Sequence, residues 1–144
     1  MLEVRHYRAI DVSAQGIKGE AHFGRVLKGR AIQDVWIMPR VGDRQAQIDR
    51  ANNMDGTTLH VWEPEIRAWR IRWINPVCGH EERPTGRMIG NDIVQVAARP
   101  DGTATRWRFT EITQDSFHWL GEALEADGRT GRLEGESRAR RLIS

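Results

Sequence analysis

Apolar and polar side chains alternate along several short runs of this chain, which is the pattern of β-strands that bury one face. In residues 68–75, Trp69 and Trp73 fall on one face, and two arginines occupy the other. The same spacing puts Trp107 and a phenylalanine on one face of residues 103–112. Because arginine side chains prefer water, the aromatic faces are predicted to point into the protein.

Turn-forming residues separate these runs at short intervals. Residues 100–102 (Pro-Asp-Gly) and 126–128 (Ala-Asp-Gly) are examples, since proline, aspartate and glycine all favour tight turns. The long connections are residues 39–56, within which residues 44–53 could form one short helix, and residues 76–87. Alternation and turns together predict about nine strands: 3–11, 17–27, 30–38, 57–63, 68–75, 88–98, 103–112, 116–124 and 131–140.

Short connections between successive strands favour antiparallel neighbours, and a long antiparallel meander has two edges to protect. Closing the meander into a barrel removes both edges, and no strong amphipathic helix is available to cover an open sheet. The prediction is therefore an all-β protein, an antiparallel up-and-down β-barrel with at most one short helix. A two-sheet sandwich is the alternative. The length of 144 residues predicts one domain spanning residues 1–144.

Composition narrows the classes of partner and compartment. The chain is 39% hydrophobic and 29% charged, as expected for a soluble globular protein. Its net charge is only +2, and acidic and basic residues intermingle, so nucleic-acid binding is not expected. No apolar run reaches membrane-spanning length, and the N-terminus lacks the form of a signal peptide. The single cysteine, Cys78, excludes an intrachain disulfide and suits a reducing cytoplasm. We therefore expect a complete, cytoplasmic protein with no membrane partner.

Three stretches of the chain resemble a known group of proteins. They are HFGRVLKGRAIQDVWIMP at 22–39, TTLHVWEP with AWRIRWINP within 57–76, and RWRFTEITQDSFHWLGEA at 106–123, which RARR follows at 138–141. These stretches are similar to small uncharacterised bacterial proteins with calycin-type, lipocalin-like β-barrels. The resemblance implies a barrel with an interior site. It brings no established catalytic residues, so none is carried over to this chain.

The tryptophans are candidates for the wall of an interior cavity. Small antiparallel barrels have interiors that side chains fill or that hold one small ligand. Tryptophans supply stiff apolar walls, each with an indole N–H that can donate a hydrogen bond. We expect a cavity for a hydrophobic or aromatic molecule, with Asn75 orienting the guest. The expected wall residues are Trp36, Trp62, Trp73, Trp107 and Trp119. The alternative is a core that these rings fill completely.

Three polar residues predicted on or near inward faces are candidates for proton transfer: Asp34, His60 and Glu111. A carboxylate and a histidine that converge on an apolar cavity could act as general base and general acid. The alternative for each residue is a strand end, where it is solvated or paired with an arginine. No metal site is predicted, because Cys78 and His80 have no further ligands at a suitable spacing. No cofactor is expected.

The predicted function is binding of a small hydrophobic or aromatic molecule. If the protein is an enzyme, the expected reaction is a cofactor-free isomerisation, cyclisation or hydrolysis of that molecule. One alternative is a carrier without chemistry, and another is a barrel that holds haem through His60 or His118. A third is a homodimer with a filled core. In that homodimer, outward apolar residues such as Val35, Ile37 and Ile74 would form the contact surface. These alternatives stay open at the level of the sequence.

Overall fold

The computed structural model describes residues 5–12, 17–40 and 54–141. These residues form strands and their connections, and no helix occurs among them. The short helix predicted within residues 44–53 lies outside the described residues. The strands are β1 (Arg5–Val12), β2 (Ile17–Val26), β3 (Ala31–Met38), β4 (Met54–Glu63), β5 (Ala68–Asn75), β6 (His80–Glu82), β7 (Thr85–Ile89), β8 (Asp92–Ala98), β9 (Ala104–Thr110), β10 (Ser116–Leu124) and β11 (Gly131–Arg141).

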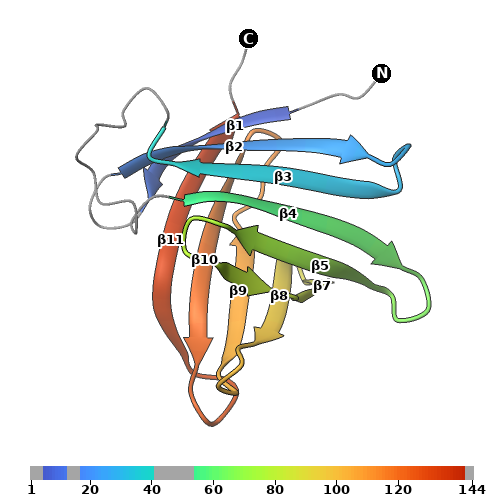
Figure 1. The fold of residues 1–144 in the computed structure, drawn as a ribbon, viewed down its shortest axis with the longest axis vertical. Helices are drawn as coiled ribbons and strands as arrows, with labels where there is room; N and C mark the ends of the chain where they lie inside the picture. The colour runs from blue at the N-terminus through green and yellow to red at the C-terminus, as the bar shows by residue number, and fades with distance from the viewer. Residues whose placement is uncertain (1–4, 13–16, 41–53, 142–144) are drawn as a thin grey trace.

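Antiparallel pairing joins the strands into one continuous sheet that curls on itself (Figure 1). The order is β4-β3-β2-β1-β11-β10-β9-β8-β7-β5, and β5 then pairs with β4. Ten strands therefore form a ring, and the short β6 pairs with the C-terminal end of β5. The seam between β5 and β7 contains two residue pairs, so the barrel is nearly closed. The antiparallel up-and-down β-barrel predicted from the sequence is confirmed, and the sandwich is not observed.

The segment between β5 and β9 differs from the prediction. Residues 88–98 were expected as one strand, but the chain turns at Gly90 and Asn91 and forms the β7–β8 hairpin. Gly90 has a φ of 61°, which glycine adopts without steric strain, so the Gly-Asn pair is the turn signal of this hairpin. The predicted connection 76–87 contains β6 and the start of β7. The extra hairpin supplies the strand that lets the ring approach closure.

The inward faces of the strands carry the core. Its buried centre lies on β2 and β3 and consists of Ala21, Trp36 and Met38. The aromatic and methionine side chains that pack against this centre are Phe23, Met54, Trp73, Phe109 and Phe117. These residues come from strands that are far apart in the sequence, so the core forms only when the ring assembles.

A register shift changes the alternation predicted for β11. It lies opposite Gly121 and Glu122 of β10. Strict alternation along residues 131–140 predicts that Leu133 points inward together with Ser137 and Ala139, but Leu133 is 55% exposed, so that part of the prediction is wrong. Beyond the shift, Ser137 and Ala139 are buried as the alternation predicts. From Gly135 to Ala139, after the β-bulge, the inward side of this strand carries only small residues.

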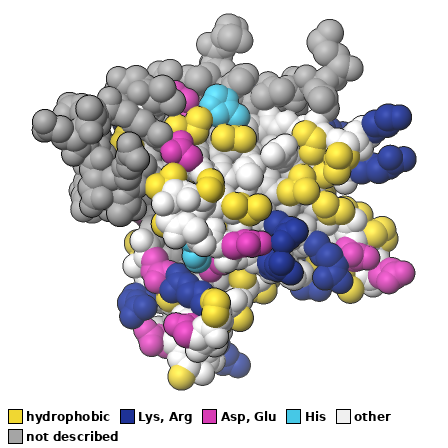
Figure 2. Space-filling model, viewed as in Figure 1, with side chains coloured by type: hydrophobic (Ala, Val, Ile, Leu, Met, Phe, Trp, Pro, Cys, Tyr) yellow, Lys and Arg dark blue, Asp and Glu magenta, His cyan; other side chains and the backbone are white. Residues whose placement is uncertain are grey.

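Charged side chains of both signs intermingle on the face of the molecule shown in Figure 2. One outer-face carboxylate is nonetheless buried: Glu122 is 8% exposed and accepts hydrogen bonds from Arg106 and Arg108. Burial raises the pKa of Glu122, but the hydrogen bonds and charges of the two arginines outweigh that effect, so the pKa lies below its ordinary value.

The described part of the chain contains no helix that could span a membrane.

Candidate functional site

The barrel contains a cavity of about 240 Å³. Its lining, which is mostly aromatic, comes from strands β3, β4, β5, β8, β9, β10 and β11. The principal apolar lining residues are Trp36, Trp73, Trp107, Phe109 and Trp119. The polar side chains in the lining include those of Asp34, Thr58, His60, Gln95 and Ser137. The interior therefore combines an apolar wall with a small number of polar groups, as small-molecule sites do.

Four indole rings form a continuous row along this wall. Trp36 contacts Trp119, Trp119 contacts Trp107, and Trp107 contacts Trp73, with ring centroids 6.2–6.4 Å apart. The interplanar angles lie between 47° and 87°, so no two rings are stacked face to face. Separations of this size are favourable for tilted and edge-to-face aromatic pairs. Each ring holds its neighbour, and the row is a preorganised apolar surface.

Glycines on the same strand or on a neighbouring strand make room for two of these rings. A Cβ at Gly56 of β4 would lie within 2.7 Å of three ring atoms of Trp73. A Cβ at Gly121 would come within 2.6 Å of the Trp119 ring, and one at Gly135 within 3.3 Å. Because any side chain at Gly56 or Gly121 would collide with an indole, the positions of the rings depend on these glycines.

Asp34 and His60 form a hydrogen-bonded pair in the lining. Asp34, on β3, is 1% exposed, and its Oδ2 lies 3.0 Å from Nε2 of His60 on β4. The other carboxylate oxygen, Oδ1, accepts the backbone N–H of Thr58 at 3.0 Å. Both oxygens therefore have a partner, which compensates for burying the group and fixes its orientation. Two of the three candidate acid–base residues are therefore brought together beside the aromatic wall.

Gln95 on β8 and Ser137 on β11 add polar groups elsewhere around the cavity, and both residues are buried. Neither residue was predicted to belong to the site. Gln95 belongs to the segment expected as one long strand, for which no inward face was assigned. Its register partner Trp107, which is inward, is the signal that places it. Ser137 lies on the face of 131–140 that alternates with charged residues and carries Gly135 and Ala139, and small inward residues of this kind leave room in a barrel.

Two of the predicted ligand-binding residues do not line this cavity. Trp62 shares a strand face with His60 but sits near the end of β4, where it is 44% exposed and pairs with Trp69 at a centroid distance of 5.4 Å. Asn75 is the last residue of β5, and its Oδ1 accepts the N–H of Val77 at 3.2 Å. Its side chain thus stabilises the following turn.

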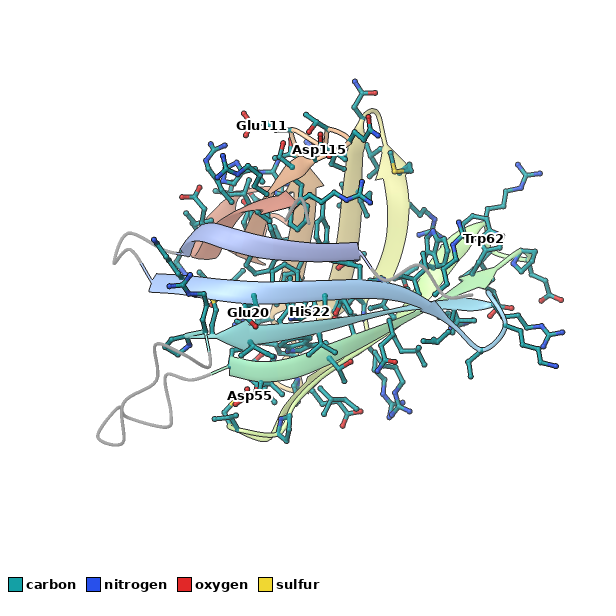
Figure 3. The ribbon with its side chains drawn as sticks, turned by 90° about the horizontal axis from the view of Figure 1, so that it is seen from above. Glu20, His22, Asp55, Trp62, Glu111 and Asp115 are labelled. Atoms are coloured by element: carbon teal, nitrogen blue, oxygen red, sulfur yellow. The ribbon has the colours of Figure 1, made fainter. Side chains whose placement is uncertain are left out.

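Glu111 does not line the cavity either. It follows the last residue of β9 and has a φ of 51°, so the strand alternation no longer applies to it. Figure 3 shows it at a different edge of the barrel from Trp62. Its carboxylate accepts a hydrogen bond from Arg138 at 2.9 Å and lies 3.3 Å from Nδ1 of His118. His118, which is buried, in turn pairs with Glu136 at 2.8 Å, so Glu111 belongs to a polar network that joins β9, β10 and β11.

Another buried carboxylate, that of Glu82, belongs to β6. Glu82 accepts a hydrogen bond from Thr105 at 3.4 Å and lies 3.8 Å from Arg99. Arg99 also makes a bidentate pair with Glu134, and that hydrogen bonding holds the pKa of Glu134 below its ordinary value despite partial burial. Across the described part of the chain, no group of three or more His, Cys, Asp or Glu side chains is placed to hold a metal ion.

Comparison with known proteins gives a fold and no family. No protein-family model matches this chain, and no curated protein matches it. Among solved structures, an S-type phycobiliprotein lyase from Guillardia theta is similar, with a TM-score of 0.51. Sequence identity is 14%, and the match covers 98% of this chain and 87% of that chain. At this identity the likeness shows a shared lipocalin-like barrel fold.

Proposed function

We propose that this chain binds one small hydrophobic or aromatic molecule inside its barrel, and that Asp34 and His60 transfer protons there. The observation that carries the proposal is the cavity of about 240 Å³, whose wall holds four indoles beside a buried carboxylate–histidine pair. Indole walls favour flat, apolar guests. A paired carboxylate and histidine beside such a wall suit general acid–base chemistry.

The volume bounds the size of the guest. An engineered apolar cavity of about 150 Å³ binds benzene, whereas pockets for drug-sized ligands span roughly 300–1,000 Å³. A cavity of about 240 Å³ therefore suits a molecule of about two fused rings. The similar barrel is a phycobiliprotein lyase, which makes a pigment-like molecule a candidate. This cavity would enclose only part of a large pigment, and the same holds for haem.

The pair supports a specific direction of proton transfer. With Asp34 ionised, Nε2 of His60 donates to Oδ2, so Nδ1 is the ring nitrogen left to accept a proton from the guest. The carboxylate orients the ring and stabilises the imidazolium that forms. Isomerisation and cyclisation each need one such group to take a proton and return it, and hydrolysis needs it to activate water. None of these steps requires a cofactor.

Tryptophan fluorescence tests the binding half of the proposal. A panel of one-ring, two-ring and pigment-like aromatic compounds is titrated into the protein, and native mass spectrometry of the purified protein checks for a guest already bound. Because four of the six tryptophans line the cavity, binding should change the emission strongly. Trp73→Phe should reduce that change and Trp62→Phe should not. An emission unaffected by every compound, with no bound mass, would contradict the proposal.

The same cavity serves a carrier that performs no chemistry. Incubating a bound compound with the wild-type protein and with Asp34→Asn separates the two roles. Conversion of the compound by the wild-type protein alone supports acid–base catalysis. Recovery of the unchanged compound from both proteins supports a carrier.

Self-association is a second candidate, favoured by the exposed apolar side chains of Val35, Val61 and Ile74 on the neighbouring strands β3, β4 and β5. Light scattering tests it: a monomer at high concentration would count against a homodimer.

We also propose that the protein works in the cytoplasm and belongs to the calycin-type bacterial family that its sequence resembles. The exposed free thiol of Cys78 suits a reducing compartment, and the barrel fold suits the family.

A further inference from the structure

The cavity contains a hydroxyl group that lacks a hydrogen bond. Ser137 is 1% exposed and lines the cavity, and its Oγ has no hydrogen-bond partner among the described residues. Burying a hydroxyl without a partner is unfavourable, and the great majority of buried polar side-chain atoms are paired. A partner from outside the chain, a guest or a water molecule, would therefore stabilise this group.

The position of Ser137 in the ring separates it from the acid–base pair. β11 is three strands from β3 and four strands from β4 in a ring of ten. Ser137 and His60 therefore lie on distant parts of the cavity wall, with the row of indoles from Trp36 to Trp73 completing the lining. A flat guest that fills the space can present one end to each residue.

We propose that Ser137 is the second polar anchor of the cavity, and that the guest is a flat, two-ring aromatic molecule with a hydrogen-bonding oxygen at each end. One oxygen, as a phenol or a carbonyl, exchanges a hydrogen bond with the Ser137 hydroxyl. The other reaches His60. This inference rests on the proposed function, because it presumes that the cavity takes an aromatic guest.

Three probes separate the apolar and polar contributions: naphthalene, a naphthol, and a naphthalenediol with one hydroxyl on each ring. Calorimetry measures their affinities for the wild-type protein and for Ser137→Ala. In the wild-type protein the diol should bind about 2- to 10-fold tighter than the naphthol, the value of one additional hydrogen bond. In Ser137→Ala that advantage should disappear, while naphthalene binds equally to both proteins.

Thermal unfolding of the free proteins gives a second readout. Ser137→Ala removes an unpaired buried hydroxyl, so its melting temperature should equal or exceed that of the wild-type protein. A structural hydroxyl would show the opposite result. Ser116→Ala is the matched control, because Ser116 lies on the neighbouring strand β10, outside the cavity lining, and is paired with Thr113 at 2.7 Å. It should leave all three affinities unchanged.

The outcomes separate this inference from the proposed function. If the three probes bind but the diol has no advantage, or keeps its advantage in Ser137→Ala, the anchor is overturned and the apolar cavity stands. A lower melting temperature of free Ser137→Ala would also overturn the anchor, since it would indicate a structural partner such as an internal water molecule. If none of the probes binds, the aromatic cavity itself is refuted, and the anchor with it.

Discussion

Gly56→Ala tests whether the indole wall has the geometry described. Gly56 is buried on β4, and its φ is not positive, so alanine fits the backbone. The added Cβ would lie within 2.7 Å of three atoms of the Trp73 ring, whereas ordinary contact begins at 3.4 Å. The closest of the three atoms would lie only 2.1 Å from that Cβ, 1.3 Å short of ordinary contact, so the ring must retreat by about that distance, away from β4 and toward the cavity that it lines.

Two opposing effects determine how much Gly56→Ala changes the free energy of unfolding. Crowding a packed interior costs about 1–3 kcal/mol, whereas replacing glycine in a strand by alanine recovers about 0.5–1 kcal/mol of backbone entropy. We expect a net loss of about 1–2 kcal/mol in the free energy of unfolding. For a chain of this size that loss corresponds to a fall of about 3–8 °C in melting temperature. Binding of an aromatic guest should weaken as well, because the displaced ring occupies part of the cavity.

Thermal unfolding followed by circular dichroism measures this effect, and the near-ultraviolet spectrum reports the environment of the indoles. Gly135→Ala is the matched control. Its φ is not positive either, and the added Cβ would approach the Trp119 ring only to 3.3 Å, so its melting temperature should change little. A Gly56→Ala protein as stable as Gly135→Ala, with an unaltered near-ultraviolet spectrum, would refute the contact between Trp73 and β4.

Substitutions at three further positions have distinct expected results. Asp34→Ala leaves the Thr58 N–H and Nε2 of His60 without an acceptor, so urea unfolding should show a loss of about 2–4 kcal/mol, and Asp34→Asn should lose less. Glu122→Gln should lose about 1–2 kcal/mol at neutral pH. The folded-state pKa of Glu122 is lowered, so its contribution to stability is present above the ordinary carboxyl pKa, about 4.3. That contribution is lost as the pH falls below this value. The free energies of unfolding of the variant and the wild-type protein should therefore converge in acid. Trp62→Phe, at an exposed ring, should change stability by less than about 1 kcal/mol.

The fold was predictable because its main signal is local. Alternation identifies an inward face within each strand, and short turns make successive strands neighbours, so a closed meander follows. The β7–β8 hairpin was not predicted, because its turn is flanked on both sides by apolar residues that resemble one continuous strand. These residues are Met88, Ile89, Ile93 and Val94. The bulge opposite Gly121 and Glu122 was not predicted either, because a single unpaired residue produces no periodic pattern in the sequence.

The site was predictable only for residues in strand interiors, where the alternation of inward and outward side chains applies. Trp73, Asp34 and His60 lie in strand interiors, where the side that a residue faces also decides whether it meets the cavity. Trp62 and Glu111 lie near or beyond strand ends, where facing the predicted side no longer means being enclosed. Which strands face one another across the ring depends on long-range closure, so the place of Ser137 relative to His60 could not be read from the local pattern.

The polar residues of the interior are hard to explain by stability alone. Asp34, Thr58, Gln95 and Ser137 are all buried among aromatic rings, where apolar side chains of similar size would avoid the desolvation of polar groups. Asp34 satisfies its oxygens locally, but the Ser137 hydroxyl has no partner in the described chain. Departures from the most stable packing concentrate where a protein contacts something other than itself. Four such departures border one cavity, which agrees with a guest there, whereas Glu82 and Thr105 form a buried polar pair outside its lining.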